Sequence, residues 1–351
     1  PKMLEFYSSH VLAYATPQRI VIINLQGEVV NEIELDKYNI SPFRLDWNEI
    51  RCQLIAWVTT GEEIKLIGMD LNDNVMDVIH TIEREKNETA PELSPGANYV
   101  SVVIWSGEMF RDSAEYQDIA VYPVNEPNPI LLSKHGGVWK YGGEWSPAGE
   151  RIAYTDYDDN GILQLYVSSN ENLSHQTQLT HFEDTDLKPG PVSWSPDNDK
   201  IALVTYHEDG DLDFWILDLN GHKPVQIALP DSIYGIYDRI YWSSGVDTVV
   251  IEAESLDERA GLYWINIDQA KISHVLDEYK AVSKNSLIDS INLLFPISTD
   301  ASVVGFVDGG VNLYKYNTQN GIIEHYFDIP ADAFLQDIIP MSLDDQSECH
   351  Y

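Results

Sequence analysis

Short runs of apolar and aromatic residues, separated by polar turns rich in Pro, Asp, Asn and Gly, recur along the whole 351-residue chain. The clearest repeating unit occurs twice, at residues 143–154 (GEWSPAGERIAY) and 192–203 (VSWSPDNDKIAL). Each copy has a short strand pattern that ends in Trp-Ser, then a turn containing Pro, then an apolar strand pattern. An acidic turn, an aromatic strand and a last short strand follow, which predicts four antiparallel strands per unit.

Weaker copies of this unit extend over most of the sequence. The residue before the turn-forming Ser or Asn marks each copy, and the markers are Tyr7, Trp47, Leu93, Trp145, Trp194, Trp242 and Ile297. A spacing of 40 to 55 residues with four short strands is typical of β-propeller blades. We therefore predict an all-β fold, a single seven-bladed β-propeller of four-stranded antiparallel blades. The blades are expected at roughly 3–36, 43–83, 91–133, 142–181, 191–229, 239–277 and 291–328.

One four-stranded blade cannot bury both of its apolar faces, so neighbouring blades must cover each other. The marker tryptophans are therefore expected to pack between blades rather than to bind a ligand. Residues 329–351 leave two possibilities open. This segment either pairs with the first blade and locks the ring, or begins an extra blade.

The pattern Trp-Ser-Pro-Asp/Ala followed by Ile-Ala resembles the propeller repeat of the TolB-like family, which is also seen in prolyl oligopeptidase relatives and oligogalacturonate lyases. The resemblance is strong over residues 143–228 and fainter over 5–325. It implies a propeller scaffold in a periplasmic or extracellular location, with a cytoplasmic one left open. The motif is specific for the repeat class and for no single function.

The charge balance narrows the classes of partner. Lys and Arg number 21 against 57 Asp and Glu, a formal net charge of −36. Such a surface repels phosphate backbones and anionic membranes, and no apolar run is long enough to span a bilayer, so neither nucleic-acid binding nor membrane insertion is expected. It attracts cations and basic protein surfaces, although excess acid also keeps a large β protein soluble.

In a propeller, the links between blades and the links from second to third strands share one face, and here those loops are strongly acidic. A long insertion, 106–117, and a glycine-rich link, 134–143, add Arg and aromatic residues of the kind that dominate interface energetics. The aromatic residues of the glycine-rich link either stack on a ligand or anchor a turn. The candidate binding residues are Phe110, Arg111, Tyr116, His135, Trp139, Tyr141, His181 and His207.

Asp156, Asp158 and Asn160, followed by Gly161, match the first half of a calcium-binding loop. Oxygens at these alternate positions can converge on Ca²⁺. The position where such a loop has its bidentate Glu is Val167, however. The alternative is a hairpin turn, for which Asn-Gly is the strongest short signal.

The sequence contains no nucleophile elbow, phosphate-binding loop or HExxH zinc motif, and no catalytic residue is predicted. The first hypothesis is a non-catalytic interaction propeller, part of a larger assembly, whose acidic face engages a basic protein partner or a cation-bridged ligand. The resemblance implies two alternatives. One is a metal-dependent polysaccharide lyase of the oligogalacturonate type, with metal held by histidines, and the other is the accessory propeller of a peptidase.

Overall fold

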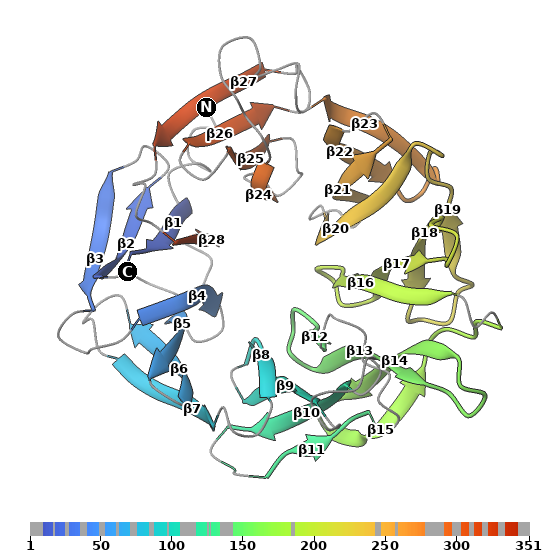
Figure 1. The fold of residues 1–351 in the computed structure, drawn as a ribbon, viewed down its shortest axis with the longest axis horizontal. Coiled ribbons are helices and arrows are strands. Elements are labelled where there is room, and N and C mark those ends of the chain that lie inside the picture. Colours follow the sequence, from blue (N-terminus) through green and yellow to red (C-terminus); the bar gives the residue numbers. More distant parts are fainter. Residues whose placement is uncertain are drawn as a thin grey trace. The chain divides into compact units, whose positions relative to one another are not determined.

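Strands are the regular elements of the described residues, and no helix occurs among them. The computed structural model (Figure 1) describes residues 10–16, 18–24, 28–35, 41–48, 53–60, 63–70, 76–83, 88–96, 98–105, 117–124, 126, 128–133, 143–183, 187–242, 247–256, 259–277, 291–296, 303–308, 312–317, 322–328 and 334–342. Within these ranges, no helix has the length and apolar character needed to cross a membrane. The all-β, four-stranded antiparallel architecture expected from the repeat is confirmed.

The first of two compact units contains residues 1–85, 285–298 and 302–351. Its described residues form three four-stranded antiparallel sheets, in the orders β28-β1-β2-β3, β4-β5-β6-β7 and β24-β25-β26-β27. The strands are β1 (His10–Ala15), β2 (Arg19–Asn24), β3 (Val29–Glu34), β4 (Ser41–Asn48), β5 (Gln53–Thr60), β6 (Glu63–Asp70), β7 (Met76–Glu83), β24 (Ile291–Pro296), β25 (Val303–Asp308), β26 (Asn312–Asn317), β27 (Ile322–Asp328) and β28 (Phe334–Ser342).

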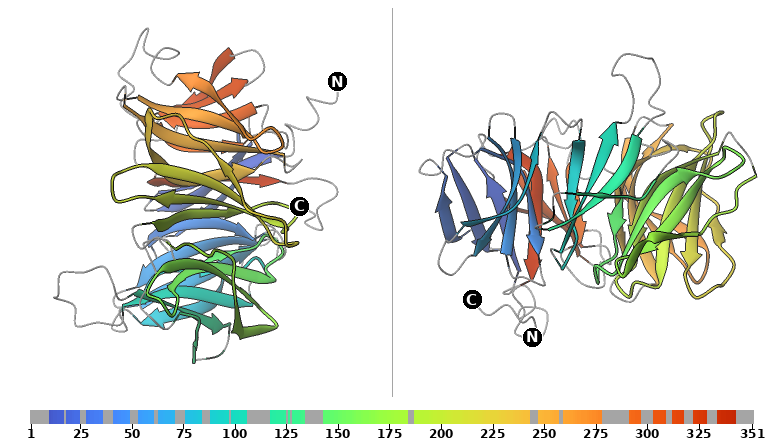
Figure 2. Two further views of the ribbon diagram at one scale, coloured as in Figure 1. Left: turned by 90° about the vertical axis from the view of Figure 1, so that its right-hand side faces the viewer. Right: turned by 90° about the horizontal axis from the view of Figure 1, so that it is seen from below.

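The second unit contains residues 86–284 and 299–301, and its described residues form four sheets in which neighbouring strands follow the chain order. Figure 2 shows the strands of these sheets from the side. The strands are β8 (Glu88–Leu93), β9 (Tyr99–Trp105), β10 (Gln117–Pro123), β11 (Ile130–Leu131), β12 (Glu144–Trp145), β13 (Arg151–Tyr157), β14 (Leu163–Ser169), β15 (Asn172–Gln178), β16 (Lys188–Trp194), β17 (Lys200–Tyr206), β18 (Leu212–Asp218), β19 (Val225–Ile227), β20 (Ile233–Trp242), β21 (Thr248–Ser255), β22 (Arg259–Asn266) and β23 (Lys271–Asp277).

The C-terminal strand β28 pairs with β1 near the start of the chain. The pairing is antiparallel and places His10 opposite Ser342 and Leu12 opposite Pro340. Of the two possibilities that the sequence left open for this segment, the structure has the pairing with the first sheet. Because β28 supplies the missing neighbour of β1, the backbone groups on that side of β1 are hydrogen-bonded rather than left as an open edge.

The marker tryptophans of the second unit connect each sheet to the one before it. Their side chains are buried, and each indole N–H donates a hydrogen bond to the preceding sheet. The pairs are Trp145 Nε1 to Ser101 Oγ at 3.1 Å, Trp194 Nε1 to the Glu144 carbonyl at 2.9 Å, and Trp242 Nε1 to the Ser193 carbonyl at 3.2 Å. These three tryptophans therefore pack between sheets, as the sequence predicted, and their polar atoms are satisfied inside the structure.

The serine that follows each marker closes the turn between the first two strands. In Ser195, the backbone N–H donates to the Lys200 carbonyl and Oγ accepts the Lys200 N–H, both at 2.9 Å. Ser94 and Ser146 make the same pair of bonds with the residue five positions later. Burial favours the neutral form of the nearby Asp197 carboxyl, but the Ser195 hydroxyl donates to it at 2.5 Å and its pKa is lowered overall.

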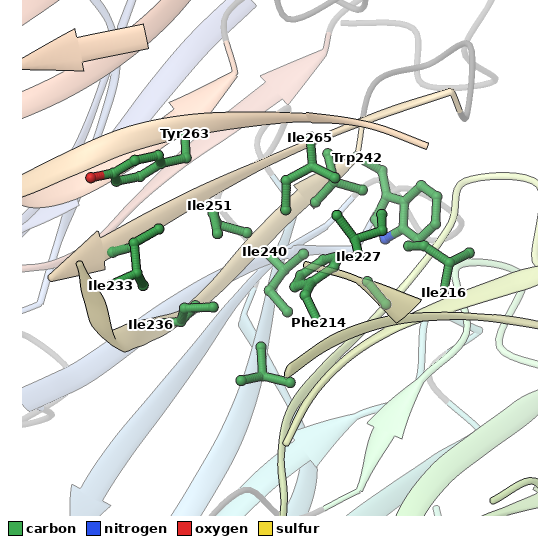
Figure 3. Close-up of a cluster of buried hydrophobic side chains, with 14 residues drawn as sticks. Phe214, Ile216, Ile227, Ile233, Ile236, Ile240, Trp242, Ile251, Tyr263 and Ile265 are labelled. Carbon is green, nitrogen blue, oxygen red and sulfur yellow. The ribbon is translucent and has the colours of Figure 1, made fainter. Parts of the chain in front are cut away.

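Apolar side chains fill the space between successive sheets. In the largest such cluster of the second unit, Phe214, Ile216 and Ile227 of one sheet meet isoleucines and Trp242 of the next (Figure 3). Phe214, Ile227 and Ile251 are fully buried. This contact removes from water the face that a lone sheet would expose, which is the main stabilising term in such a fold.

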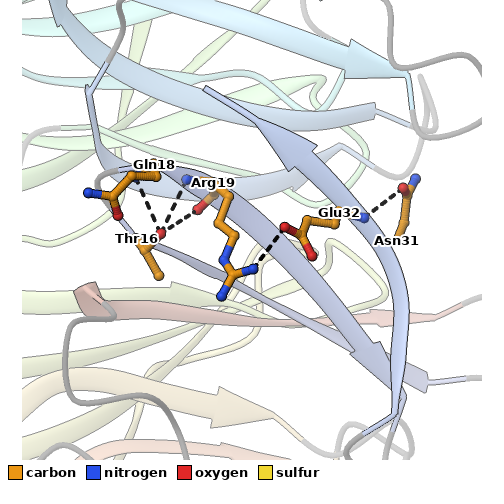
Figure 4. A network of polar contacts seen from close by, with 5 residues as sticks. All are labelled: Thr16, Gln18, Arg19, Asn31 and Glu32. Atoms are coloured by element: carbon orange, nitrogen blue, oxygen red, sulfur yellow. Dashed lines mark hydrogen bonds and ion pairs between the residues drawn. The ribbon is translucent and has the colours of Figure 1, made fainter. Parts of the chain in front are cut away.

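A polar turn of the first unit shows how surface links are fixed. Between β1 and β2, Thr16 Oγ1 accepts the N–H of Arg19 at 3.2 Å, and the Thr16 N–H donates to the Arg19 carbonyl at 2.8 Å (Figure 4). The Arg19 guanidinium pairs with Glu32 of β3 at 2.9 Å. Both side chains of this ion pair are exposed, so the pair orients the strands more than it stabilises them.

Replacing the buried Ser195 by alanine should destabilise the fold by about 1–3 kcal/mol, because the backbone N–H of Lys200 loses its side-chain acceptor. Urea denaturation would measure the change in the free energy of unfolding. Ser174→Ala, on an exposed position of β15, is the matched control and should change it by less than about 0.5 kcal/mol. Equal effects of the two substitutions would contradict this role for Ser195.

Deleting residues 329–351 should leave β1 with an open edge, and we expect loss of soluble monomer in size-exclusion chromatography and a lower midpoint of thermal unfolding. Deleting only residues 343–351 keeps β28 and should have little effect. A shortened chain without β28 that melts like the full one would show that the pairing with β1 contributes little to stability.

Candidate functional site

An open polar depression of about 460 Å³ lies on the sheet β12–β15 of the second unit. It is formed by the turn between β13 and β14, by β14 and β15, and by the start of the link that leads to the next sheet. The residues that line it are Asp156, Tyr157, Asp158, Asp159, Asn160, Gln164, Tyr166, Gln176, Gln178, His181, Phe182 and Glu183. A turn from second to third strand and a link between sheets therefore meet at one place, as the propeller pattern predicted.

The turn between β13 and β14 is a tight hairpin. The Asp158 N–H donates to the Ile162 carbonyl and the Gly161 N–H donates to the Asp158 carbonyl, both at 2.9 Å. Gly161 has a φ of 76°, in the left-handed region that favours glycine. The hairpin interpretation of the Asn-Gly sequence is thus confirmed.

The Asp158 carboxylate organises this turn. Its Oδ1 accepts the backbone N–H groups of Asn160 and Ile162, each at 2.9 Å, and its Oδ2 accepts Gln164 Nε2 at 3.3 Å. Hydrogen bonds to a carboxylate favour its charged form. The bond from Ile162 is the main reason that the pKa of Asp158 is lowered, with further bonds from Asn160 and Gln164.

Gln164 is a buried junction between the turn, β14 and the link after β15. Its Oε1 accepts the Thr180 hydroxyl at 2.8 Å and the Phe182 N–H at 3.0 Å. Its Nε2 donates to the Phe182 carbonyl at 2.8 Å as well as to Asp158. A fully bonded buried amide fixes its surroundings, so Gln164 holds the two loops of the depression at a fixed separation.

The equivalent position in the neighbouring sheets has other partners. In the preceding sheet, the residue at the position of Gln164 is Asp118, which accepts a hydrogen bond from the Ser133 hydroxyl at 3.0 Å. Ser133 Oγ in turn accepts the Ile119 N–H. Thr180 Oγ1 accepts the Leu165 N–H in the same way. In the following sheet it is Asp213, which contacts His207 at 3.0 Å and accepts Gln226 Nε2 at 2.6 Å. The same backbone position therefore carries a different polar group in each sheet.

The polar floor of the depression follows from strand periodicity. Tyr166 of β14 lies opposite Gln178 of β15, and Gln164 and Gln176 lie two residues away along the same faces. Burial is the main reason that the pKa of the Tyr166 hydroxyl is raised, with a further contribution from the surrounding aspartates, Asp156 first among them. These four residues were not predicted as site residues, although the alternation along both strands was a signal for them.

The depression carries negative charge. Four carboxylates line it, from Asp156, Asp158, Asp159 and Glu183, and no Lys or Arg is among the lining residues that the structure describes. Phe182 adds an aromatic wall and contacts Trp215 of the next sheet with ring centroids 6.1 Å apart. This contact fixes the link segment against the neighbouring sheet.

The calcium candidates Asp156, Asp158 and Asn160 all line the depression. Asp156 is buried, and its Oδ1 accepts the N–H of Tyr157 at 2.9 Å, while Asp158 bonds its own turn. Among the described residues, no group of three or more His, Cys, Asp or Glu side chains is placed to hold a metal ion. The calcium site stays a prediction.

Two of the eight predicted binding residues lie within the described part of the chain. His181 lines the depression and is exposed, whereas His207 lies on the next sheet, bonded to Asp213. The other six predicted binding residues, Phe110, Arg111, Tyr116, His135, Trp139 and Tyr141, lie outside the described residues.

Comparison with known proteins gives the fold. No family model matches the sequence, and no curated protein matches it. Among solved structures, a prolyl endopeptidase is similar at a TM-score of 0.60 and 13% identity, over 93% of this chain and 51% of that chain. The β-propeller domain of the Trilobed protease from Pyrococcus furiosus is similar at a TM-score of 0.51 and 15% identity, over 82% and 84%.

TolB from Acinetobacter baumannii is similar at a TM-score of 0.49 and 16% identity, over 76% of this chain and 63% of that chain. The chain therefore spans about half to two thirds of the length of two of these proteins. At such identities the likeness concerns the fold alone. The chain has a β-propeller fold.

Aspartate 158 should matter for stability in a pH-dependent way. Because its pKa is lowered in the folded state, its contribution is complete above the ordinary carboxyl value of about 3.9 and is lost as the pH falls through the folded-state pKa. We expect Asp158→Ala to lower the midpoint of thermal unfolding at pH 7, with a cost of about 1 kcal/mol, and the difference from the unaltered protein to shrink toward pH 3. Asp159→Ala, on the exposed neighbour, is the control, and a difference independent of pH would refute the assignment.

Proposed function

We propose that this chain is a non-catalytic binding propeller whose acidic face engages a basic segment of a protein partner, as part of a larger assembly outside the cytoplasm. The observation that supports this most directly is the depression between the β13–β14 turn and the link after β15. It combines carboxylates, amide groups and aromatic rings in one open site.

The chemistry of the lining suits a lysine or arginine side chain. Carboxylates pair with the cationic head, amide oxygens accept its remaining N–H groups, and aromatic rings attract a cation placed over their faces. Among the described residues that line the depression, acidic side chains are present and Lys and Arg are not. An acidic residue of a partner would meet like charge here and would be rejected.

The rigidity of the residues that form the depression also favours binding. Gln164 joins the two loops through four hydrogen bonds, and Phe182 is held against Trp215. Loops positioned by a rigid scaffold are where binding residues are commonly found. Little ordering entropy is then lost when a partner binds.

Further carboxylates continue the acidic surface on the next sheet. The β17–β18 turn contains Glu208, Asp209 and Asp211, all exposed, and it is closed by the same type of hairpin bonds, from the His207 N–H to Asp211 and from the Gly210 N–H to His207. Such a surface steers a basic partner over distances of about a Debye length, so association should weaken with salt. The calcium site, the lyase and peptidase-accessory alternatives and the extracytoplasmic location stay predictions.

An oligo-lysine peptide is a suitable probe for this site. Isothermal titration calorimetry should show binding that weakens with added salt, while an oligo-glutamate peptide should not bind. The double variant Asp159→Asn, Glu183→Gln should lower the affinity about fivefold, as expected for two partly screened charge interactions of about 0.5 kcal/mol each.

The matched control removes the same two charges elsewhere, with Asp268→Asn and Glu34→Gln at exposed positions. We expect its affinity to stay within about twofold of the unaltered protein. If both double variants lose affinity equally, the peptide senses only the total charge and the depression is not the binding site.

A further inference from the structure

The structure assigns a spontaneous modification site to Asn220, in the segment between β18 and β19. We propose that Asn220 deamidates through a cyclic imide formed with the backbone nitrogen of Gly221. This inference is independent of the proposed binding function. It rests on a comparison of two turns that share one sequence motif.

The reaction needs only water. The backbone nitrogen of Gly221 attacks Cγ of Asn220, so that a new C–N bond forms and the Cγ–Nδ2 bond breaks. Ammonia leaves and takes up the proton lost from the Gly221 N–H. Water then opens the imide at either of its two carbonyls and gives aspartate or isoaspartate, so the neutral amide becomes a carboxylate and the chain gains one negative charge.

The motif Asp-x-Asn-Gly occurs twice in the second unit, at residues 158–161 and 218–221. In both copies the Asp Oδ1 accepts the N–H of the Asn, at 2.9 Å for Asn160 and 2.7 Å for Asn220. Both glycines are exposed, with φ values of 76° and 88° and no atom within 4 Å of the place where a Cβ would be. The glycine gives the attacking nitrogen unhindered access in both turns.

The two turns differ in what holds the attacking nitrogen. The Gly161 N–H donates to the Asp158 carbonyl at 2.9 Å, and the Asn160 side chain is hydrogen-bonded to the Asp158 carboxylate. In the region 187–242, which the structure describes without a gap, the Gly221 N–H has no hydrogen-bond acceptor. Asn220 and Gly221 are therefore free to reach the geometry of attack, while the first copy must break its turn.

Strand register explains the difference. The first motif bridges β13 and β14, whose pairing continues to Tyr157 opposite Leu163 at the base of the turn. The pairing of β18 with β19 begins only at Ile216 opposite Val225. Asp218 is still paired with Lys200 of β17, and the Leu219 N–H donates to the Asp199 carbonyl at 2.9 Å. Asn220 and Gly221 lie beyond both pairings, in the wider connection from β18 to β19.

Peptide mapping by mass spectrometry tests this directly. The purified chain is incubated at pH 8 and 37 °C, and the conversion of Asn220 and of Asn160 to aspartate plus isoaspartate is followed over time. We expect Asn220 to convert about tenfold faster, the factor that corresponds to about 1.4 kcal/mol for the hydrogen bond retained around Asn160. Equal rates, or faster conversion of Asn160, would overturn the proposal.

Two controls isolate the cause. In a denaturant, where both turns are lost, the two Asn-Gly pairs should react at similar rates, and a persisting difference would show that local sequence rather than the fold decides. Asn220→Gln should abolish the modification at 220, because the larger ring of a glutamine imide forms slowly, and should leave the rate at Asn160 unchanged. The third Asn-Gly pair, Asn320–Gly321, lies outside the described residues.

Discussion

A four-stranded antiparallel sheet with apolar side chains on both faces cannot be stable alone in water, and this constraint governs the structure. In the second unit each sheet buries its faces against the next, with Phe214 and Ile227 of one sheet against Ile240 and Ile251 of the following one. Buried tryptophans such as Trp194 add a directional bond to this contact, because the indole N–H reaches a carbonyl of the preceding sheet. Packing and hydrogen bonding thus act at the same contacts.

The turns divide into those that maintain the scaffold and those that differ between sheets. In three successive sheets, Ser94, Ser146 and Ser195 each make the same two hydrogen bonds to the residue five positions later, one from the serine N–H and one to the serine Oγ. At the other end of the same sheets, the position held by Asp118, Gln164 and Asp213 forms a different network each time. A repeat of this kind can change its surface chemistry at one end without disturbing the packing that the other end supports.

Asp158 both maintains its turn and contributes to the surface of the proposed site. Its carboxylate closes the hairpin and also lines the depression, so backbone N–H groups fix its charge in place. The second Asp-x-Asn-Gly turn, around Asn220, has the same side-chain cap but lacks the closing bond of its glycine. The same short motif therefore forms different hydrogen bonds depending on the strands that flank it.

The sequence by itself determined the strands, their grouping in fours and the role of the marker tryptophans of the second unit, because these depend on local alternation and on turn chemistry repeated along the chain. Trp194 and Ser195 could be assigned to packing and turn formation from the repeat alone, and Asn160-Gly161 could be assigned to a hairpin. The aromatic and amide residues of the depression, Tyr166, Gln176 and Phe182, could not be grouped with Asp158 and His181. Their proximity depends on strand register and on the path of the link after β15, which are set by contacts between residues distant in sequence. Tertiary structure also decided that β28 pairs with β1. By its sequence, the same segment was equally suited to begin a further sheet. The edge of β1, which would otherwise be unpaired, distinguishes the two outcomes.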